Sequence, residues 1–179
     1  ENQLHRLTAS GMDVAVGIKN PMSGSILVLL NSIYAAQSGQ VFMLNGWQVK
    51  TEGNPLAHAI LRGAVDGYGN DMPNFHYETV MQVIDGYAKS GLSNPAIIVD
   101  ANHSNSGKKF KEQIRICEEV MNNRLYSSDF KKNVKGFMIE SFIEEGNQSE
   151  DRIYGKSITD PCLGWCDTER LLLDIANKV

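Results

Sequence analysis

Pro95-Ala-Ile-Ile-Val-Asp-Ala-Asn-His103 is the stretch of sequence that decides the fold. Its first five residues are all apolar, which predicts a strand buried on both faces, as in a parallel sheet. Polar residues, including His103, follow at once. Parallel strands place functional groups at their C-terminal ends, so we expect the residues after this strand to face a site.

Other short apolar or extended runs along the chain also end on a charged residue. The first two end on a cation, and the last two end on a carboxylate. The residues concerned are Lys19, Arg62, Glu140 and Asp160. If these runs are parallel strands, the four side chains and His103 converge on one pocket that holds a divalent metal beside an anion.

Apolar residues at helical spacing separate these runs. The predicted helices cover residues 1–10, 26–39, 77–90, 109–124 and 168–178. Four strand and helix alternations favour a parallel α/β fold. Because four strands are half of a closed eight-stranded barrel and leave two open edges, we expect the chain to be the C-terminal part of a longer protein.

Two segments depart from the strand and helix alternation. The runs 41–44 and 47–51 flank Asn45-Gly46, a strong hairpin signal, and predict a small antiparallel β-ribbon. A glycine-rich loop is expected over 63–74, and a long polar loop over 143–155.

The composition is that of an ordinary folded domain, with 42% hydrophobic and 21% charged residues in 179, so we expect a single domain over 1–179. A net charge of −4 argues against nucleic-acid binding. No apolar run is long enough to cross a membrane, and no signal peptide is evident. Three cysteines, an odd number, favour reduced thiols and a cytoplasmic location.

His103, Glu140 and Asp160 together offer an imidazole and two carboxylates, a ligand set that suits Mn, Fe, Co or Zn. A histidine after a strand can instead simply cap it by hydrogen bonding. Lys19 and Arg62 bind either a carboxylate of a neighbouring strand or a phosphate or carboxylate ligand. Both interpretations hold if the ligand replaces the carboxylate.

Two apparent motifs fail. Ser106-Gly-Lys-Lys109 lacks the upstream glycine and the final Ser or Thr of a phosphate-binding loop. Cys162 and Cys166 have the wrong spacing for a zinc knuckle and no second pair. Lys108, Lys109 and Lys111 are interpreted as a solvated helix face.

Several strings, in order along essentially the whole chain, closely resemble the type I 3-deoxy-D-arabino-heptulosonate 7-phosphate (DAHP) synthases. They include Val16-Gly-Ile-Lys-Asn20, Ile60-Leu-Arg-Gly63, Asp100-Ala-Asn-His-Ser-Asn-Ser106, Glu145-Gly-Asn-Gln148 and Tyr154-Gly-Lys-Ser-Ile-Thr-Asp160. The resemblance implies the C-terminal half of a (β/α)8 TIM barrel. It also implies a metal-dependent transferase that condenses phosphoenolpyruvate with erythrose 4-phosphate, the first step of the shikimate pathway to aromatic amino acids.

The resemblance places the metal ligands of the family on His103, Glu140 and Asp160, and its phosphoenolpyruvate-binding, catalytic cations on Lys19 and Arg62. In the family a fourth ligand, a cysteine, and further basic residues lie in the first half of the barrel. None of the three cysteines here matches, so we expect the chain alone to be inactive.

The ribbon matches a family element associated with an aromatic amino acid effector and with subunit contacts, which implies a homo-oligomer. Two alternatives remain open. The chain is a non-catalytic half-barrel that binds phosphate ligands or a partner chain, or it belongs to a different metal-dependent phosphosugar aldolase.

Overall fold

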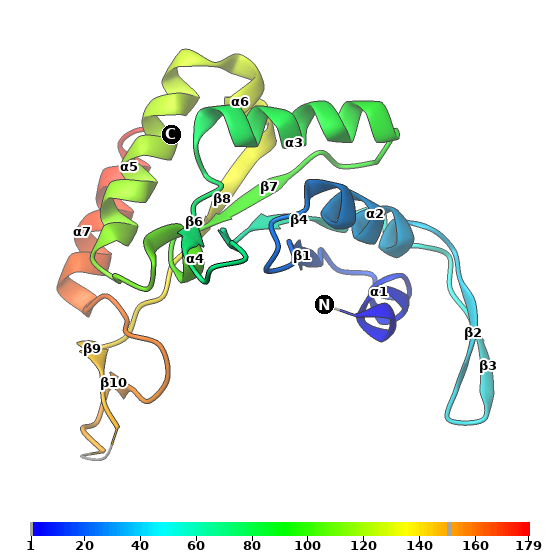
Figure 1. Ribbon diagram of the computed structural model, residues 1–179, viewed down its shortest axis with the longest axis horizontal. Helices are drawn as coiled ribbons and strands as arrows, with labels where there is room; N and C mark the ends of the chain where they lie inside the picture. Colours follow the sequence, from blue (N-terminus) through cyan, green and yellow to red (C-terminus); the bar gives the residue numbers. More distant parts are fainter. Residues whose placement is uncertain (1, 150–151) are drawn as a thin grey trace.

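A four-stranded parallel sheet forms the centre of the protein in the computed structural model, which describes residues 2–149 and 152–179 (Figure 1). The strand order is β1-β4-β7-β8, and every pairing is parallel. The strands are β1 (Gly17–Lys19), β4 (His58–Leu61), β7 (Ile97–Asp100) and β8 (Val134–Met138). The predicted parallel α/β fold is confirmed.

The strands carry apolar residues at most of their buried positions, because one hydrophobic core covers them. Leu61, Ile97 and Val99 are completely buried, and Ile18 is nearly so. Each such side chain stabilises the fold by about 1.5–3 kcal/mol relative to exposure in water. The apolar run after Pro95 therefore forms a strand inside the sheet, as its composition predicts.

Helices follow the strands along the chain and pack on one another. The described helices are α1 (Gln3–Ala9), α2 (Ile26–Gln37), α3 (Tyr77–Ser90), α4 (His103–Ser106), α5 (Glu112–Tyr126), α6 (Ser128–Asn133) and α7 (Trp165–Ala176). Contacts run from α2 to α3, α6, α5 and α7 in turn, and Figure 1 shows these helices as an arc along the outer side of the sheet. Their buried faces share one hydrophobic core with the strands.

The predicted ribbon is present as the antiparallel pair β2 (Val41–Leu44) and β3 (Trp47–Lys50). Asn45 and Gly46 at its turn both have positive φ, 49° and 83°, as a type I′ hairpin requires. The ribbon extends away from the sheet (Figure 1), and Trp47 is 77% exposed.

Several short elements differ from the sequence-based expectation. The glycine-rich loop contains β5 (Ala64–Val65) paired with β6 (Asp71–Met72), and the polar loop contains β9 (Glu144–Asn147), paired with β10 (Lys156–Ser157) beyond it. Helices α4 and α6 were not expected. The first helix, expected over 1–10, spans Gln3–Ala9, with Asn2 and Ser10 as its caps. Glu1 and positions 150 and 151 of the polar loop lie outside the described residues.

Within the described ranges, no helix combines the length and the apolar character needed to cross a bilayer.

Candidate metal centre

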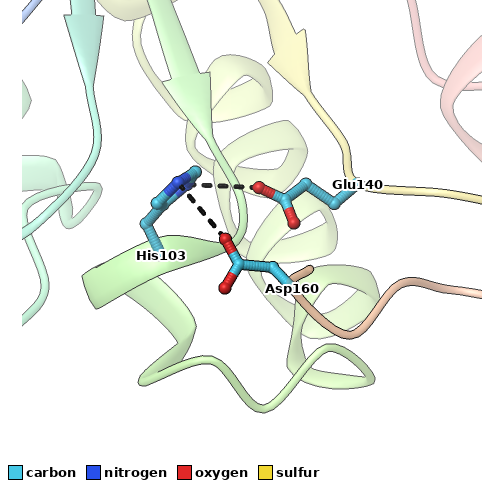
Figure 2. Close-up of side chains that lie close together, drawn as sticks. All are labelled: His103, Glu140 and Asp160. Atoms are coloured by element: carbon cyan, nitrogen blue, oxygen red, sulfur yellow. Dashed lines mark ion pairs between the residues drawn. The ribbon is translucent and has the colours of Figure 1, made fainter. Parts of the chain in front are cut away.

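His103, Glu140 and Asp160 lie together beyond the C-terminal ends of β7 and β8 (Figure 2). One ligand atom from each side chain lies within 4.8 Å of the others. His103 Nδ1 is 3.5 Å from Glu140 Oε1, and His103 Nε2 is 4.0 Å from Asp160 Oδ2. Among the described residues, this is the only such group of histidine, cysteine, aspartate or glutamate side chains suited to a metal ion.

Two local features hold His103 and Glu140 in place. His103 begins α4 with φ at 46°, a backbone conformation that is rare for residues other than glycine and is often found at functional sites. Glu140 lies two residues beyond β8, outside the sheet. There the side chain of the buried Gln113 of α5 hydrogen-bonds the backbone of Glu140. The Gln113 amide accepts from the backbone N–H of Glu140 at 2.8 Å and donates to its carbonyl at 3.0 Å.

Each carboxylate has one oxygen already hydrogen-bonded and one directed at His103. Asn102 Nδ2 donates to Glu140 Oε2 at 2.9 Å, and Lys108 Nζ donates to Asp160 Oδ1 at 3.0 Å. These bonds leave Oε1 and Oδ2 for a metal. Such outer partners orient the ligands of metal sites and tune their affinity.

Lys108 also affects the charge of Asp160. Its hydrogen bond lowers the pKa of Asp160 below the usual value, burial opposes this effect, and the charges of Lys108, His103 and Arg62 lower the pKa further. Asp160 is therefore ionised at neutral pH and ready to act as a ligand. Lys108 is solvated, with 61% of its side chain exposed. Lys108, Lys109 and Lys111 are all exposed, as expected, but they lie between α4 and α5, so their interpretation as a helix face was wrong.

Lys19 forms the ion pair that one interpretation of the sequence predicts. Its Nζ donates a hydrogen bond of 2.9 Å to Oδ2 of Asp100. Asp100 ends β7, which β4 separates from β1 in the sheet. Asp100 is completely buried, whereas 35% of the Lys19 side chain is exposed. An anionic ligand can therefore reach Lys19 from solvent.

Arg62 follows β4, and no ion pair to it is found in the described part of the chain. Its Nε is buried and has no hydrogen-bond partner there. Only one other buried side-chain nitrogen or oxygen in the described residues lacks a partner, and it is His103 Nδ1. Since buried polar groups are normally paired, the unpaired Nε of Arg62 indicates that a ligand completes this part of the site.

Three buried asparagines tie the strand ends together. Asn20, after β1, accepts from the backbone N–H of Arg62 at 2.9 Å. Asn74 donates to Asn20 at 3.1 Å, and Asn105 of α4 donates to the carbonyl of Leu61 at 3.0 Å. The strand ends that carry Lys19, Arg62 and His103 are thus held in one rigid network.

The three residues fit a divalent metal. A histidine and two ionised carboxylates with free oxygens facing it form the donor set expected for Mn, Fe, Co or Zn. None of the three free cysteines belongs to the group, although the Cys162 thiol donates to the backbone carbonyl of Asp160 at 3.4 Å.

Sequence reasoning placed five residues in this region, and it missed Asn102, Lys108, Gln113 and the role of Asp100. Asp100 carried a usable signal because it ends a buried strand. Gln113 carried none, since its importance depends on how α5 packs on Glu140.

Fold and site together define the class: a parallel α/β domain with a candidate metal centre beside two cations at the ends of its strands. The chain belongs to the DAHP synthetase I family, whose profile matches residues 1–173. The expected family is confirmed.

Known relatives cover the whole chain. It is 38% identical over 188 residues to phospho-2-dehydro-3-deoxyheptonate aldolase of Haemophilus influenzae and 40% identical over 189 residues to the Phe-sensitive enzyme of that name from Escherichia coli K12. These matches cover 49% and 51% of the relatives. The Trp-sensitive Escherichia coli K12 enzyme is 35% identical.

A solved structure of phospho-2-dehydro-3-deoxyheptonate aldolase from Francisella tularensis matches with a TM-score of 0.87 and 30% identity, over 100% of this chain and 52% of the solved one. The chain thus spans about half the length of the curated relatives it matches.

Proposed function

We propose that the chain forms the C-terminal half of a (β/α)8 barrel and that the full-length protein condenses phosphoenolpyruvate with erythrose 4-phosphate. The products are DAHP and phosphate, and the reaction is the first step of the shikimate pathway. The family and the convergence of His103, Glu140 and Asp160 within 4.8 Å support this proposal. The convergence carries it, because residues far apart in sequence form one ligand set.

In this proposal His103, Glu140 and Asp160 hold a divalent ion, with Mn, Fe, Co or Zn as candidates. When bound, the ion supplies Lewis-acid polarisation of the aldehyde oxygen of erythrose 4-phosphate. Asn102 and Lys108 keep the two carboxylates oriented toward that position.

Lys19 and Arg62 bind the phosphoenolpyruvate anion in this proposal and act by placement. The unpaired Nε of Arg62 provides a donor, and Lys19 exchanges its bond to Asp100 for one to the ligand. They hold C3 of phosphoenolpyruvate against the aldehyde carbon, which lowers the entropic cost of the encounter and stabilises shifting charge. The new carbon–carbon bond forms, water adds at C2, and phosphate leaves.

The ribbon β2–β3 is proposed to be an insertion in the barrel that takes part in effector binding and subunit contact within a homo-oligomer. Two of the relatives carry the names Phe-sensitive and Trp-sensitive, which supports an aromatic amino acid effector. The free cysteines fit a reducing compartment, and we place the enzyme in the cytoplasm.

The test is to incubate the full-length protein with both substrates and Mn²⁺ and to assay heptulosonate formation. We expect activity in the wild type, its loss in His103→Ala, and wild-type activity in His5→Ala, a substitution of an exposed histidine on α1. No product from the wild type would support the non-catalytic half-barrel. We expect no product from residues 1–179 alone, and product there would contradict the proposed division of the site between two halves.

A further inference from the structure

Asp100 is the one acidic residue among the described positions that is fully buried, and it lies between the two parts of the site. Its Oδ2 atom is 2.9 Å from Lys19 Nζ and 2.9 Å from His103 Nδ1. Its Oδ1 atom accepts from the backbone N–H of Asn102 at 3.1 Å. The backbone bond fixes the orientation of the carboxylate, so the same oxygen faces both the cation and the imidazole.

Only one of these two neighbours is hydrogen-bonded to that oxygen. Lys19 donates to Oδ2, whereas His103 Nδ1 lies as close but forms no hydrogen bond of normal geometry to any described residue. The nitrogen is buried, so water does not reach it. The structure therefore shows Lys19 hydrogen-bonded to Asp100, and His103 Nδ1 close to Asp100 Oδ2 and 3.5 Å from Glu140 Oε1 without an aligned hydrogen bond to either.

We propose that Asp100 is a positioning residue that couples binding of phosphoenolpyruvate to binding of the metal, an inference that rests on the proposed function. When the anion draws Lys19 away, Oδ2 of Asp100 becomes free to accept the Nδ1–H of His103. That bond fixes the tautomer and the ring orientation, and it directs Nε2, which faces Asp160, toward the metal. A carboxylate behind a histidine ligand raises its basicity and strengthens metal binding.

The coupling is reciprocal. A metal on His103 holds the proton on Nδ1 and strengthens its bond to Asp100, which weakens the hold of Asp100 on Lys19. Lys19 then binds the phosphoenolpyruvate anion more readily. By linkage, each ligand raises the affinity of the other by the same factor.

The first experiment measures Mn²⁺ affinity of the full-length protein by electron paramagnetic resonance, with and without phosphoenolpyruvate and without the second substrate. We expect phosphoenolpyruvate to tighten Mn²⁺ binding by about tenfold in the wild type, within the usual range for coupled sites. Asp100→Asn keeps the shape of the side chain. Its amide NH₂ faces Lys19 and His103 if its oxygen keeps the bond to Asn102, so it accepts from neither of them.

In Asp100→Asn we expect Mn²⁺ to bind roughly 10–100-fold more weakly, the usual cost of losing an outer partner, and the effect of phosphoenolpyruvate to fall severalfold. Asp85→Asn, which removes the same charge from the exposed face of α3, should keep the full coupling. Undiminished coupling in Asp100→Asn would overturn the inference. Binding of both ligands to the wild type without coupling would overturn it too, with the proposed function intact, whereas binding of neither would refute the proposed function itself.

The second experiment needs no substitution at Asp100. It therefore tests the proposal even if Asp100→Asn fails to fold. Nitrogen-15 labelled histidine reports the Nδ1–H proton of His103 in the metal-free wild type, assigned by its absence in His103→Gln. We expect this proton to move downfield when phosphoenolpyruvate is added, because a hydrogen bond to Asp100 forms. An unchanged signal at saturating phosphoenolpyruvate would overturn the proposal.

Discussion

At the scale of single residues, the candidate metal centre depends on side chains that hold the ligands as much as on the ligands themselves. Gln113 hydrogen-bonds the backbone N–H and C=O of Glu140. Asn102 donates to one carboxylate oxygen of Glu140, and Lys108 donates to one carboxylate oxygen of Asp160. Each of the two carboxylates thus keeps one oxygen for the centre of the site. Sequence reasoning found the ligands, because each ends a strand or an extended run, but it missed their supports, which three-dimensional packing brings in from elsewhere.

Replacing Gln113 by leucine tests this support. The variant leaves the backbone N–H of Glu140 without its partner, whereas the carbonyl keeps a bond from the N–H of Leu163. An unpaired buried group costs about 1–3 kcal/mol, so we expect a loss of about that size in the free energy of unfolding. Urea denaturation measures it. Gln82→Leu, at an exposed position of α3, is the control, and an equally small change in both variants would show that Gln113 does not hold Glu140.

The cysteines provide a second prediction at this scale. Burial raises the pKa of the Cys117 thiol to about 12, and the charge of Glu118 adds to the effect. Since pH 8 is far below this pKa, only on the order of one part in 10⁴ of Cys117 is thiolate, the form that reacts. We expect iodoacetamide at pH 8 to label the exposed Cys166 long before Cys117, as peptide mass spectrometry would show. Equal rates in the native protein would contradict the burial, and denaturant should remove the difference.

At the scale of elements, the strand ends are placed by close backbone contact as well as by the asparagine network. Gly63, directly after Arg62, has φ at 79°, and a Cβ added there would come within 2.6 Å of backbone atoms of Ser104 and Asn105 in α4. The loop after β4 therefore lies directly against the helix that carries His103. This contact sets the distance between Arg62 and the metal ligands.

Gly63→Ala should break that contact. The left-handed backbone alone costs an alanine about 1–2 kcal/mol, and the clash with α4 adds to it. Gly69→Ala is the matched control, because Gly69 also has positive φ, 87°, but nothing lies within 4 Å of an added Cβ. We expect the melting temperature to fall clearly further in Gly63→Ala than in Gly69→Ala. An equal fall in both would show that the packing against α4 is unimportant.

The larger elements could be predicted from the sequence and the small ones could not. Residues 77–90 were expected as a helix and form α3 with the same bounds, because the apolar spacing is strong and Gly91 ends the helix with φ at 61°. The pair β9–β10 is held instead by side-chain bonds within its own loop, such as those of the Gln148 amide to the carbonyls of Ile153 and Lys156. Such elements leave no periodic signal in the sequence.

At the scale of the whole molecule, the sheet ends in β1 on one side and β8 on the other, and within the described residues neither has a second neighbour. Lys19, Arg62, His103 and Glu140 lie at or just beyond the C-terminal ends of these strands, and Asp160, which follows β10 outside the sheet, lies beside His103 and Glu140. This arrangement is what half of a closed barrel provides, and it supports the proposal that the other half of the site comes from the remainder of the barrel.

The most direct test of the central claim is a crystal structure of the full-length protein with Mn²⁺, located by its anomalous scattering. We expect one manganese ion bonded to a ring nitrogen of His103 and to carboxylate oxygens of Glu140 and Asp160, each at about 2.0–2.3 Å. A manganese ion bound elsewhere, with these three side chains outside its coordination sphere, would contradict it.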